Sequence, residues 1–255
     1  MNEDAKINAT KLSFQVVETV YDLNDPGVTE IANTTDIPRS TVFDHLQTLE
    51  QLGFLINRDG TYRTSTRFLA LGNRARNDMK IYSKSNPRLE ELSQDVQEFV
   101  GLEIMENGLS VLLSVIEGQK ASRMGVGNVY AGLRTRLHTT ATGKAILSQL
   151  PDTRVREIID RYPLNASTEN TITNEEILFE NLAEIRDQGY ALDLEERFSG
   201  MQGIGAPIVS TDEGIIGAIF VYGPRNRLSD DRLETEIADK VLETANEIQV
   251  GLDLS

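Results

Sequence analysis

His138 and the acidic segment DLEE at residues 193–196 are the side chains in this sequence best suited to acid–base chemistry. A small-molecule hydrolase or lyase could pair His138 with Asp193 or Glu195. The chain has no cysteine, only one other histidine and no serine-elbow motif, so no nucleophile accompanies His138. The sequence therefore favours a structural or ligand-contacting role for His138. The DLEE segment has two interpretations, a solvated acidic turn or a carboxylate of Asp193 that accepts a hydrogen bond from a ligand hydroxyl, and we expect no catalytic residue.

Two glycine-containing segments resemble nucleotide-binding motifs but lack the residues that define them. In TGKA, residues 142–145, the first glycine of a phosphate-binding loop would fall on His138, and the last position is Ala145. In GMQGIG, residues 200–205, Pro207 and a β-rich run follow where a helix should begin. We therefore expect no cofactor, and two histidines without cysteine make a metal site improbable. The threonine-rich helix start before Gly143 can still offer unpaired N–H groups to an anion such as a carboxylate.

The segment IPRSTVFDHLQTLEQLGFL, residues 37–55, has the pattern of a helix that lies in a DNA groove. Pro38 fits the first turn of a helix, where its missing N–H does no harm. Val42, Leu46 and Leu49 recur at helical spacing and would face a core. The opposite face is polar and comprises Arg39, Ser40, Thr41, Asp44, Gln47 and Thr48.

Two shorter helices are predicted before this segment and a hairpin after it. Residues 11–21 carry apolar residues at helical spacing and end before the turn NDPG. A second short helix is expected to start with Thr29 as its N-cap. Gly53 ends the third helix, and FLI and YRT around NRDG predict a two-stranded hairpin. Three helices followed by a hairpin make a winged helix-turn-helix, which we place at residues 1–65.

A local excess of positive charge follows the third helix. Residues 58–80 contain five arginines and one lysine against Asp59 and Asp78, and the hairpin would place Arg58 and Arg63 against the DNA backbone. A small helical interaction domain is the alternative, but the polar helix face and the basic hairpin together favour DNA. The predicted DNA-binding residues are Thr29, Arg39, Ser40, Thr41, Asp44, Gln47, Arg58 and Arg63.

Residues 66–82, TRFLALGNRARNDMKIY, are helical in pattern, with apolar residues between arginines. We expect a linker helix that pairs with its copy in a homodimer, which would explain apolar residues outside either domain core. A dimer would present two DNA-binding domains to half-sites about 34 Å apart in a pseudo-palindromic operator.

From residue 83 to residue 255 strands and helices alternate in a mixed order. Strands are predicted at FVGLEIME, LSVLLSVIEG, YALDL, GIGAPIVST and IIGAIFVYG, and a Thr-capped helix at RLHTTATGKAILSQL. Residues 152–162 and 174–188 and a long final segment capped by Ser229 are predicted as helices. This order indicates an α+β domain, an antiparallel sheet flanked by helices with a ligand pocket on one face.

The chain carries a formal net charge of -15. Residues 1–82 hold nine basic and eleven acidic residues, whereas residues 83–255 hold sixteen basic and twenty-nine acidic ones. Few lysines, many acids and no tryptophan favour a halophilic protein over an ordinary acidic one, because molar salt shortens the Debye length to about 3 Å. No segment has the ~20 apolar residues of a membrane span and no signal sequence is evident, so we expect a cytoplasmic protein without membrane partners.

Along nearly its whole length the sequence resembles the IclR family of transcriptional regulators. The segments that carry the resemblance are IPRSTVFDHLQTLEQLGFL with YRTSTRFLALG, RLHTTATGKAIL, IRDQGYALDLEERFSGMQGIGAPI and IIGAIFVYGP. The resemblance implies a winged helix-turn-helix with a GAF-like effector-binding domain, assembled as a homodimer or a dimer of dimers. It also implies that a small organic, sugar or aromatic acid controls binding to the operators of catabolic genes. The effector positions it implies are Met124, His138, Ala141, Thr142, Asp193, Met201, Gly203, Phe220 and Tyr222.

The sequence departs from the family at several of these positions. Phe220 and Tyr222 stand where glyoxylate-type members have serines, and Gly203 stands where they have a cysteine, which puts a two-carbon acid in doubt. Asp44 replaces a basic residue of the recognition helix, and its carboxylate could accept a hydrogen bond from cytosine N4. A third reading, besides the regulator and the enzyme, is a degenerate sensor that binds only protein partners.

Overall fold

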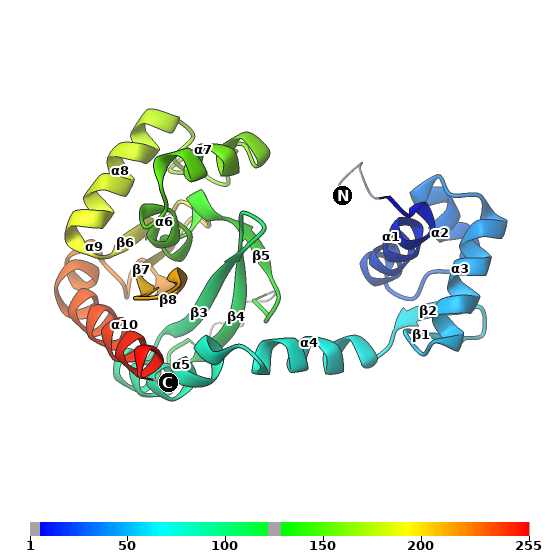
Figure 1. The fold of residues 1–255 in the computed structure, drawn as a ribbon, viewed down its shortest axis with the longest axis horizontal. Coiled ribbons are helices and arrows are strands. Elements are labelled where there is room, and N and C mark those ends of the chain that lie inside the picture. Colours follow the sequence, from blue (N-terminus) through cyan, green and yellow to red (C-terminus); the bar gives the residue numbers. More distant parts are fainter. Residues whose placement is uncertain (1–5, 122–128, 255) are drawn as a thin grey trace. The chain divides into compact units, whose positions relative to one another are not determined.

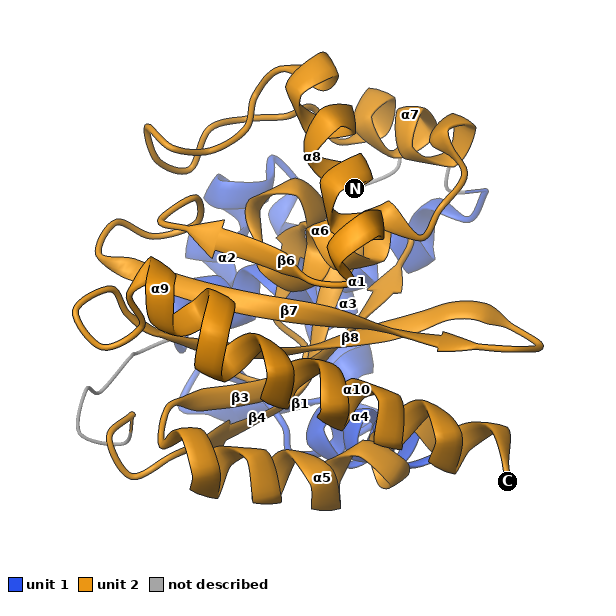
Figure 2. Ribbon diagram, turned by 90° about the vertical axis from the view of Figure 1, so that its left-hand side faces the viewer, with its two compact units in different colours: residues 1–78 blue, residues 79–255 orange. Residues whose placement is uncertain are grey.

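The computed structural model describes residues 6–121 and 129–254. The chain divides into two compact units, residues 1–78 and residues 79–255, shown in different colours in Figure 2. Figure 1 labels the helices and strands of both units along the chain.

The first unit is a three-helix bundle followed by a hairpin. Its helices are α1 (Asn8–Leu23), α2 (Val28–Thr35) and α3 (Arg39–Gln51), and its strands are β1 (Leu55–Arg58) and β2 (Thr61–Thr64). Asp36 adopts the left-handed conformation between α2 and α3, with φ of 55°, and forms the tight turn of a helix-turn-helix. The core of this unit consists of Val16, Val20, Ile31, Ile37, Val42, Leu46, Leu55 and Tyr62.

The start of α2 differs from the prediction, and the expectation that Thr29 caps this helix is wrong. The helix begins at Val28, and the flanking residue is Gly27, which offers no side-chain cap. The Gly27 carbonyl accepts hydrogen bonds from the backbone N–H groups of Glu30 and Ile31. Gly27 is also held in extended backbone by a bridge to Thr61 of the hairpin. This tertiary contact fixes the helix start, and Thr29 is an exposed residue of its first turn.

The hairpin turns at Asp59 and Gly60, with φ of 52° and 90°. Two successive positive φ values are the geometry of a two-residue hairpin turn whose twist matches that of the strands. The pairing sets Leu55 opposite Thr64 and Ile56 opposite Arg63. The predicted hairpin is therefore present, with its register fixed.

The single linker helix expected over residues 66–82 is instead two helices. Helix α4 covers Arg67–Asn77, and α5 covers Lys80–Val96. Between them Met79 has extended backbone, with φ of −80° and ψ of 116°. The reason lies in packing, because Met79 contacts the core of the second unit and Ile81, 8% exposed, is part of that core. Met79 and Ile81 are thus not exposed apolar residues of a linker.

The second unit is built on a six-stranded antiparallel sheet with the order β5-β4-β3-β8-β7-β6. Its strands are β3 (Phe99–Glu106), β4 (Leu109–Glu117), β5 (Arg134–Arg136), β6 (Ala191–Leu194), β7 (Met201–Ser210) and β8 (Gly214–Pro224). The predicted turn between β3 and β4 is formed by Asn107 and Gly108, both with positive φ. The short edge strand β5 was not predicted, since three residues carry no periodic signal.

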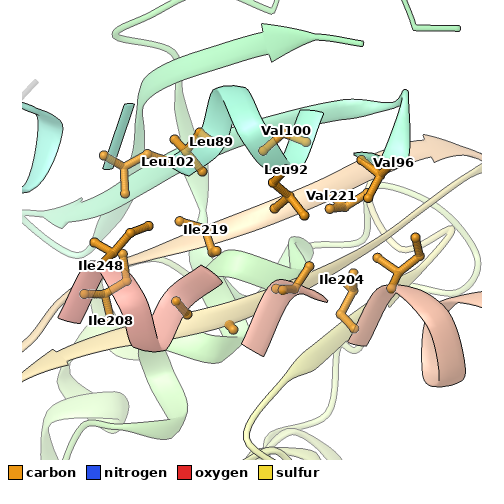
Figure 3. Close-up of a cluster of buried hydrophobic side chains, with 14 of the residues drawn as sticks. Leu89, Leu92, Val96, Val100, Leu102, Ile204, Ile208, Ile219, Val221 and Ile248 are labelled. Atoms are coloured by element: carbon orange, nitrogen blue, oxygen red, sulfur yellow. The ribbon is translucent and has the colours of Figure 1, made fainter. Parts of the chain in front are cut away.

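One face of the sheet is covered by α5 and by α10 (Ala238–Asp253) (Figure 2). Alternate residues of β3, β7 and β8 point toward these helices, and Figure 3 shows their side chains meeting those of α5 and α10. The predicted long final helix is interrupted, because α9 (Asp230–Arg232) passes through a π-helical turn, Leu233–Ile237, before α10. Ser229 precedes α9 without a capping hydrogen bond from its side chain.

The other face carries α6 (Ala141–Ser148), with α7 (Asp152–Arg161) and α8 (Glu175–Gln188) around it (Figure 2). A short 3₁₀ turn, Leu137–Thr139, precedes α6. The Thr140 side chain accepts a hydrogen bond from the Gly143 N–H, which confirms the Thr-capped start of this helix. The observed architecture confirms the predicted α+β class, a helix-turn-helix followed by an antiparallel sheet with helices on its faces.

Candidate functional site

The outer face of α3 carries the polar residues predicted to contact DNA. Arg39, Ser40, Asp44 and Gln47 are exposed, and Thr41 is half-buried. The inner face holds Val42 and Leu46, both 0% exposed. The apolar face anchors the helix in the bundle while the polar face remains free for a partner.

The hairpin register places Arg58 and Arg63 on one face of the wing. Cross-strand partners point to the same face, so Arg58 with Thr61 and Arg63 with Ile56 share one face. Leu55 and Tyr62 belong to the opposite face and enter the core. Arg58 is exposed and Arg63 is half-buried. Both side chains therefore leave the hairpin on the face opposite Leu55 and Tyr62, and the Nε of Arg63 is buried.

Arg67 belongs to the same basic run but has a different role. Its Nη1 donates to the Leu52 carbonyl at 2.5 Å, and its guanidinium lies 4.7 Å from the centre of the Phe54 ring. The Phe68 ring packs on Phe54 with the ring centres 5.1 Å apart. These contacts connect the start of α4 to the end of α3. The apolar side chain of Phe68 is therefore packed within the first unit.

In the second unit a cavity of about 290 Å³ lies between α6 and the sheet. Most of its lining is apolar, which is typical of a small-molecule site. The lining residues are Phe99, Glu103, Leu112, Val115, Val129, Leu133, Thr135, Thr140, Ala141, Thr142, Asp193, Arg197, Phe198, Gly203, Phe220, Val221 and Tyr222.

Two aromatic rings of β8 lie over two glycines of the neighbouring strands. A Cβ atom at Gly101 of β3 would be 2.5 Å from the Phe220 ring, and one at Gly203 of β7 would be 2.6 Å from the Tyr222 ring. Any larger residue at either glycine would therefore collide with a ring. Because the glycines leave this room, the two rings lie against the sheet and line the cavity on either side of β8.

Asp193, Gly203, Tyr222 and Phe99 occupy one row of cross-strand partners across the sheet. Asp193 is 1% exposed, and its Oδ1 accepts from the Glu196 N–H at 2.8 Å. Burial, reinforced by the Glu196 carboxylate, raises the pKa of Asp193 to about 7. Burial, reinforced by the Asp193 carboxylate, also raises the pKa of Tyr222, so its hydroxyl keeps its proton. The Tyr222 hydroxyl is buried and has no hydrogen-bond partner among residues 6–121 and 129–254.

Glu103 of β3 lies at the start of α6. Its Oε2 accepts from the Thr142 hydroxyl at 2.5 Å and from the Ser110 hydroxyl at 2.5 Å. Glu103 is only 8% exposed. Glu103 therefore places a carboxylate of the chain itself beside the Thr142 side chain in the first turn of α6.

Behind the cavity Lys144 of α6 forms a buried ion pair with Glu196, with the two side chains 3% and 7% exposed. The pair joins α6 to the segment that follows β6. Arg197, the next residue, lines the cavity, and its guanidinium lies 4.9 Å from the centre of the Phe198 ring.

The cavity brings together six of the nine predicted effector residues, namely Ala141, Thr142, Asp193, Gly203, Phe220 and Tyr222. Met201 is not among its lining residues, and Met124 lies outside the described residues. His138 is buried elsewhere, where its Nε2 lies 3.1 Å from the Asn165 carbonyl oxygen. Burial lowers the pKa of His138, so the ring is neutral at physiological pH. His138 is therefore not brought to Asp193 in the cavity.

Sequence reasoning missed Phe99, Glu103 and Arg197. Phe99 and Glu103 lie on the same face of β3 as Gly101, so strand alternation could have found them once β3 was paired with β8. Arg197 follows β6 in an irregular segment and gave no periodic signal.

No group of three or more metal-binding side chains occurs among residues 6–121 and 129–254. Within the same residues, no helix is long and apolar enough to cross a membrane.

Comparison with known proteins places both units. Residues 74–250 match the family model for the C-terminal domain of bacterial transcriptional regulator IclR, and residues 13–58 match the IclR helix-turn-helix domain. The chain belongs to the IclR family of transcriptional regulators. The predicted resemblance is thereby confirmed, and the protein is a regulator with a helix-turn-helix domain and a C-terminal effector-binding domain.

Similar proteins match this IclR-family regulator over nearly its whole length. A Halobacterium salinarum protein, "Probable HTH-type transcriptional regulator ArcR", is 28% identical over 98% of this chain and 96% of its own. The Thermotoga maritima IclR structure is 26% identical, with a TM-score of 0.78 over 96% of this chain and 99% of its own. An IclR homologue from Microbacterium hydrocarbonoxydans, solved with 4-hydroxybenzoate, has 22% identity and a TM-score of 0.80 over 97% of this chain and 100% of its own.

Proposed function

We propose that this regulator binds a pseudo-palindromic operator as a homodimer, and that a small organic acid in the cavity of the second unit controls its affinity for that operator. One observation carries the proposal. The same chain presents an exposed polar face on α3 beside a basic wing, and it encloses an apolar cavity with a few polar groups at its walls.

In this proposal Arg39 of α3 and the wing residues Arg58 and Arg63 contact phosphates. Phosphate contacts fix the position of a protein on DNA but carry no sequence information. Ser40, Asp44 and Gln47 on the exposed face of α3 then contact base edges. Thr29 and Thr41 contact the backbone beside them.

The exposed apolar residues of the first unit support the homodimer. Ile7, which directly precedes α1, and Phe14 and Tyr21 on α1 are 66%, 56% and 63% exposed and follow each other at intervals of seven residues. Leu69 and Leu71 on α4 are 62% and 53% exposed. Apolar side chains at heptad spacing on a helix are typical of helix–helix pairing.

Charge complementarity on α1 indicates a second copy of the same helix as the partner. Ile7, Phe14 and Tyr21 form an apolar stripe. Lys11 follows Ile7 by four positions and Glu18 follows Phe14 by four positions, so both charges lie on the same side of this stripe. If two copies of α1 pair in antiparallel orientation, Lys11 of one copy lies beside Glu18 of the other, twice by symmetry. Phe14 then packs against Val17 of the other copy at the centre.

The ligand acts through a difference in affinity between two states of the dimer. A ligand that binds both states equally cannot change operator affinity. The Microbacterium homologue was solved with a small aromatic acid, which supports a small organic acid as the effector here. We place the protein in the cytoplasm, where its operator lies, and infer from the excess of acidic residues that it works at high salt.

The test for DNA binding is a gel-shift titration with the DNA upstream of its own gene. We expect Arg39→Ala and Arg63→Ala to weaken binding to every duplex, each by about tenfold, because each removes a phosphate contact. Substitutions at Ser40 or Asp44 should instead change which sequences are preferred. Unchanged binding in both arginine variants would contradict the assignment.

A further inference from the structure

The cavity of the second unit has an acidic end. Glu103 lies at the start of α6, where a helix favours a negative charge. Its carboxylate already accepts hydrogen bonds from the hydroxyls of Ser110 and Thr142. A ligand carboxylate bound at the same helix start would lie beside this buried carboxylate. Like charges repel strongly where water is largely excluded, so the helix start is a poor position for the acid group of a ligand.

The cavity also has a basic position. Arg197 is the one lysine or arginine among the described residues that line it. Within residues 6–121 and 129–254, no carboxylate lies within ion-pair distance of the Arg197 guanidinium. Its recorded side-chain neighbour is the Phe198 ring. A guanidinium of this kind can bind a carboxylate through two parallel hydrogen bonds.

The Tyr222 hydroxyl is a second donor near this position. It is buried and finds no hydrogen-bond partner in the part of the chain that the structure describes, although a buried hydroxyl normally has one. Arg197, Asp193 and Tyr222 all line the cavity, and the charges of Arg197 and Asp193 act on the pKa of Tyr222. Burial favours the neutral form of the neighbouring Asp193, so the Tyr222 hydroxyl and the Arg197 guanidinium can serve the same acceptor beside it.

Most of the remaining wall of the cavity is apolar. It includes the aromatic and aliphatic side chains of Phe99, Leu112, Val115, Leu133, Phe220 and Val221, beside the polar groups of Thr135, Thr140 and Asp193. This lining favours a ligand body that is mostly apolar over the several hydroxyls of a sugar acid.

We propose that the ligand of this cavity is a monocarboxylate with a flat apolar body, whose acid group is bound by Arg197 and the Tyr222 hydroxyl. Glu103 at the start of α6 excludes a second acid group. This inference rests on the proposed function, since it names the effector class of the same cavity. Dicarboxylates and compact oxoacids are poor ligands in this assignment.

Isothermal titration calorimetry on the full chain without DNA tests the proposal with three probes. Benzoate carries one carboxylate on an aromatic ring, terephthalate carries a second one at the opposite end, and glyoxylate is compact and polar. We expect benzoate to bind at one site per chain, at least about tenfold more tightly than either other probe. No benzoate binding at about 10 mM, or tighter binding of terephthalate or glyoxylate, overturns the proposal.

Three variants locate the acid group. Arg197→Gln should weaken benzoate binding by about tenfold or more, because it removes a charge-assisted hydrogen bond. Arg161→Gln is the matched control, since Arg161 is exposed on α7 and does not line the cavity. Glu103→Gln keeps an acceptor for the two hydroxyls but removes the charge. The difference in affinity between benzoate and terephthalate should therefore become smaller in this variant. The assignment is overturned if Arg197→Gln and Arg161→Gln bind benzoate with equal affinity and if the affinity difference between benzoate and terephthalate is unchanged in Glu103→Gln.

Two further measurements separate this inference from the proposed function and from misfolding. Gel shifts without ligand report operator binding alone, so their failure counts against the proposed function while the calorimetry still decides the ligand class. If Arg197→Gln does not fold, Arg197→Lys keeps the positive charge but loses the bidentate geometry. It should retain benzoate binding with a smaller loss, and complete loss in a folded Arg197→Lys variant would contradict a charge-based role.

Discussion

Asp193 is a carboxyl group whose protonation depends on whether the protein is folded. It is 1% exposed, and burial raises its pKa from the ordinary 3.8 to about 7. Below about pH 4 the group is protonated in both states and does not affect stability. As the pH rises toward 7, the unfolded chain releases this proton while the folded protein keeps it. The free energy of unfolding therefore falls between about pH 4 and about pH 7. Above about pH 7, Asp193 causes no further change in stability.

Asp193→Asn tests that behaviour. The Glu196 N–H donates a hydrogen bond of 2.8 Å to Asp193 Oδ1, and an asparagine Oδ1 can still accept it. The asparagine side chain, however, does not titrate. We expect the variant to gain stability relative to the natural protein as the pH rises from about 5 to about 7.5. Thermal melting temperatures of both proteins at a fixed salt concentration provide the comparison. A difference that does not vary with pH would show that Asp193 is ionised in the folded state.

At the residue scale, sequence reasoning identified the cavity residues that lie in family motifs. It missed those that reach the cavity only through strand pairing and tertiary contacts. Asp193, Phe220 and Tyr222 come from recognisable segments. Arg197 lies in an irregular segment after β6, and Glu103 belongs to a strand 39 residues before Thr142 in the chain. A contact between a strand and a distant helix start depends on sheet order, which a single sequence does not specify.

At the element scale, the approach of α6 to the sheet depends on Gly205. A Cβ atom there would be 2.8 Å from the Thr142 backbone nitrogen and 3.0 Å from the Ala141 carbonyl carbon. Backbone atoms cannot rotate away, so Gly205→Ala must displace α6 from β7. We expect a loss of about 1–3 kcal/mol in the free energy of unfolding, measured by urea titration.

Gly251→Ala is the control for that substitution. Gly251 lies in α10, and outside the backbone of its own helix no atom of the described residues lies within 4 Å of its Cβ position, so alanine should be neutral or stabilise the helix by up to about 1 kcal/mol. If both substitutions had the same effect, the close packing of α6 on β7 would not be a constraint.

The heptad stripe of α1 leads to a prediction about assembly. Phe14→Glu places a charge at the centre of the proposed helix pair, and we expect operator affinity to fall by at least about tenfold because the two DNA-binding units are no longer held together. Asn33→Glu on α2, which is also exposed, is the control for added negative charge. Operator affinity from gel shifts and self-association from sedimentation are the measurements.

The charge pair beside the stripe supplies an independent check. Lys11→Glu and Glu18→Lys should each weaken self-association by a few-fold at low salt, and the double variant should recover it. Recovery is expected because exchanging both charges restores attraction in an antiparallel pair. A double variant weaker than either single one would argue against this pairing.

Elements with a strong periodic signal were predictable, and tertiary contacts decided the rest. The three helices of the first unit, the hairpin and strands β3, β4, β7 and β8 all followed from their patterns. Residues 66–82 look helical and arginine-rich, yet Met79 and Ile81 pack on the core of the second unit, which divides the expected linker helix at Asp78. The start of α2 at Val28 likewise depends on the pairing of Gly27 with Thr61.

At the scale of the whole molecule, the charge of -15 is a source of self-repulsion. Raising the salt concentration from about 0.1 M to about 1 M shortens the Debye length from about 10 Å to about 3 Å and screens that repulsion. We expect the thermal melting temperature to rise over this range in potassium chloride. Chloride is preferable to sulfate, which stabilises proteins in general. An unchanged or lower melting temperature would contradict adaptation to high salt.

The two faces of β8 have different neighbours. Phe220 and Tyr222 line the cavity on one face, whereas Gly217 lies on the other, where its Cβ position is 2.7 Å from Cδ1 of Ile81 in the first turn of α5. Substitutions that alter the ligand can therefore be made on one face without touching the packing that joins the strand to the segment leading to α4. A biosensor for another metabolite could be engineered by redesigning these two aromatic positions while its promoter is kept unchanged.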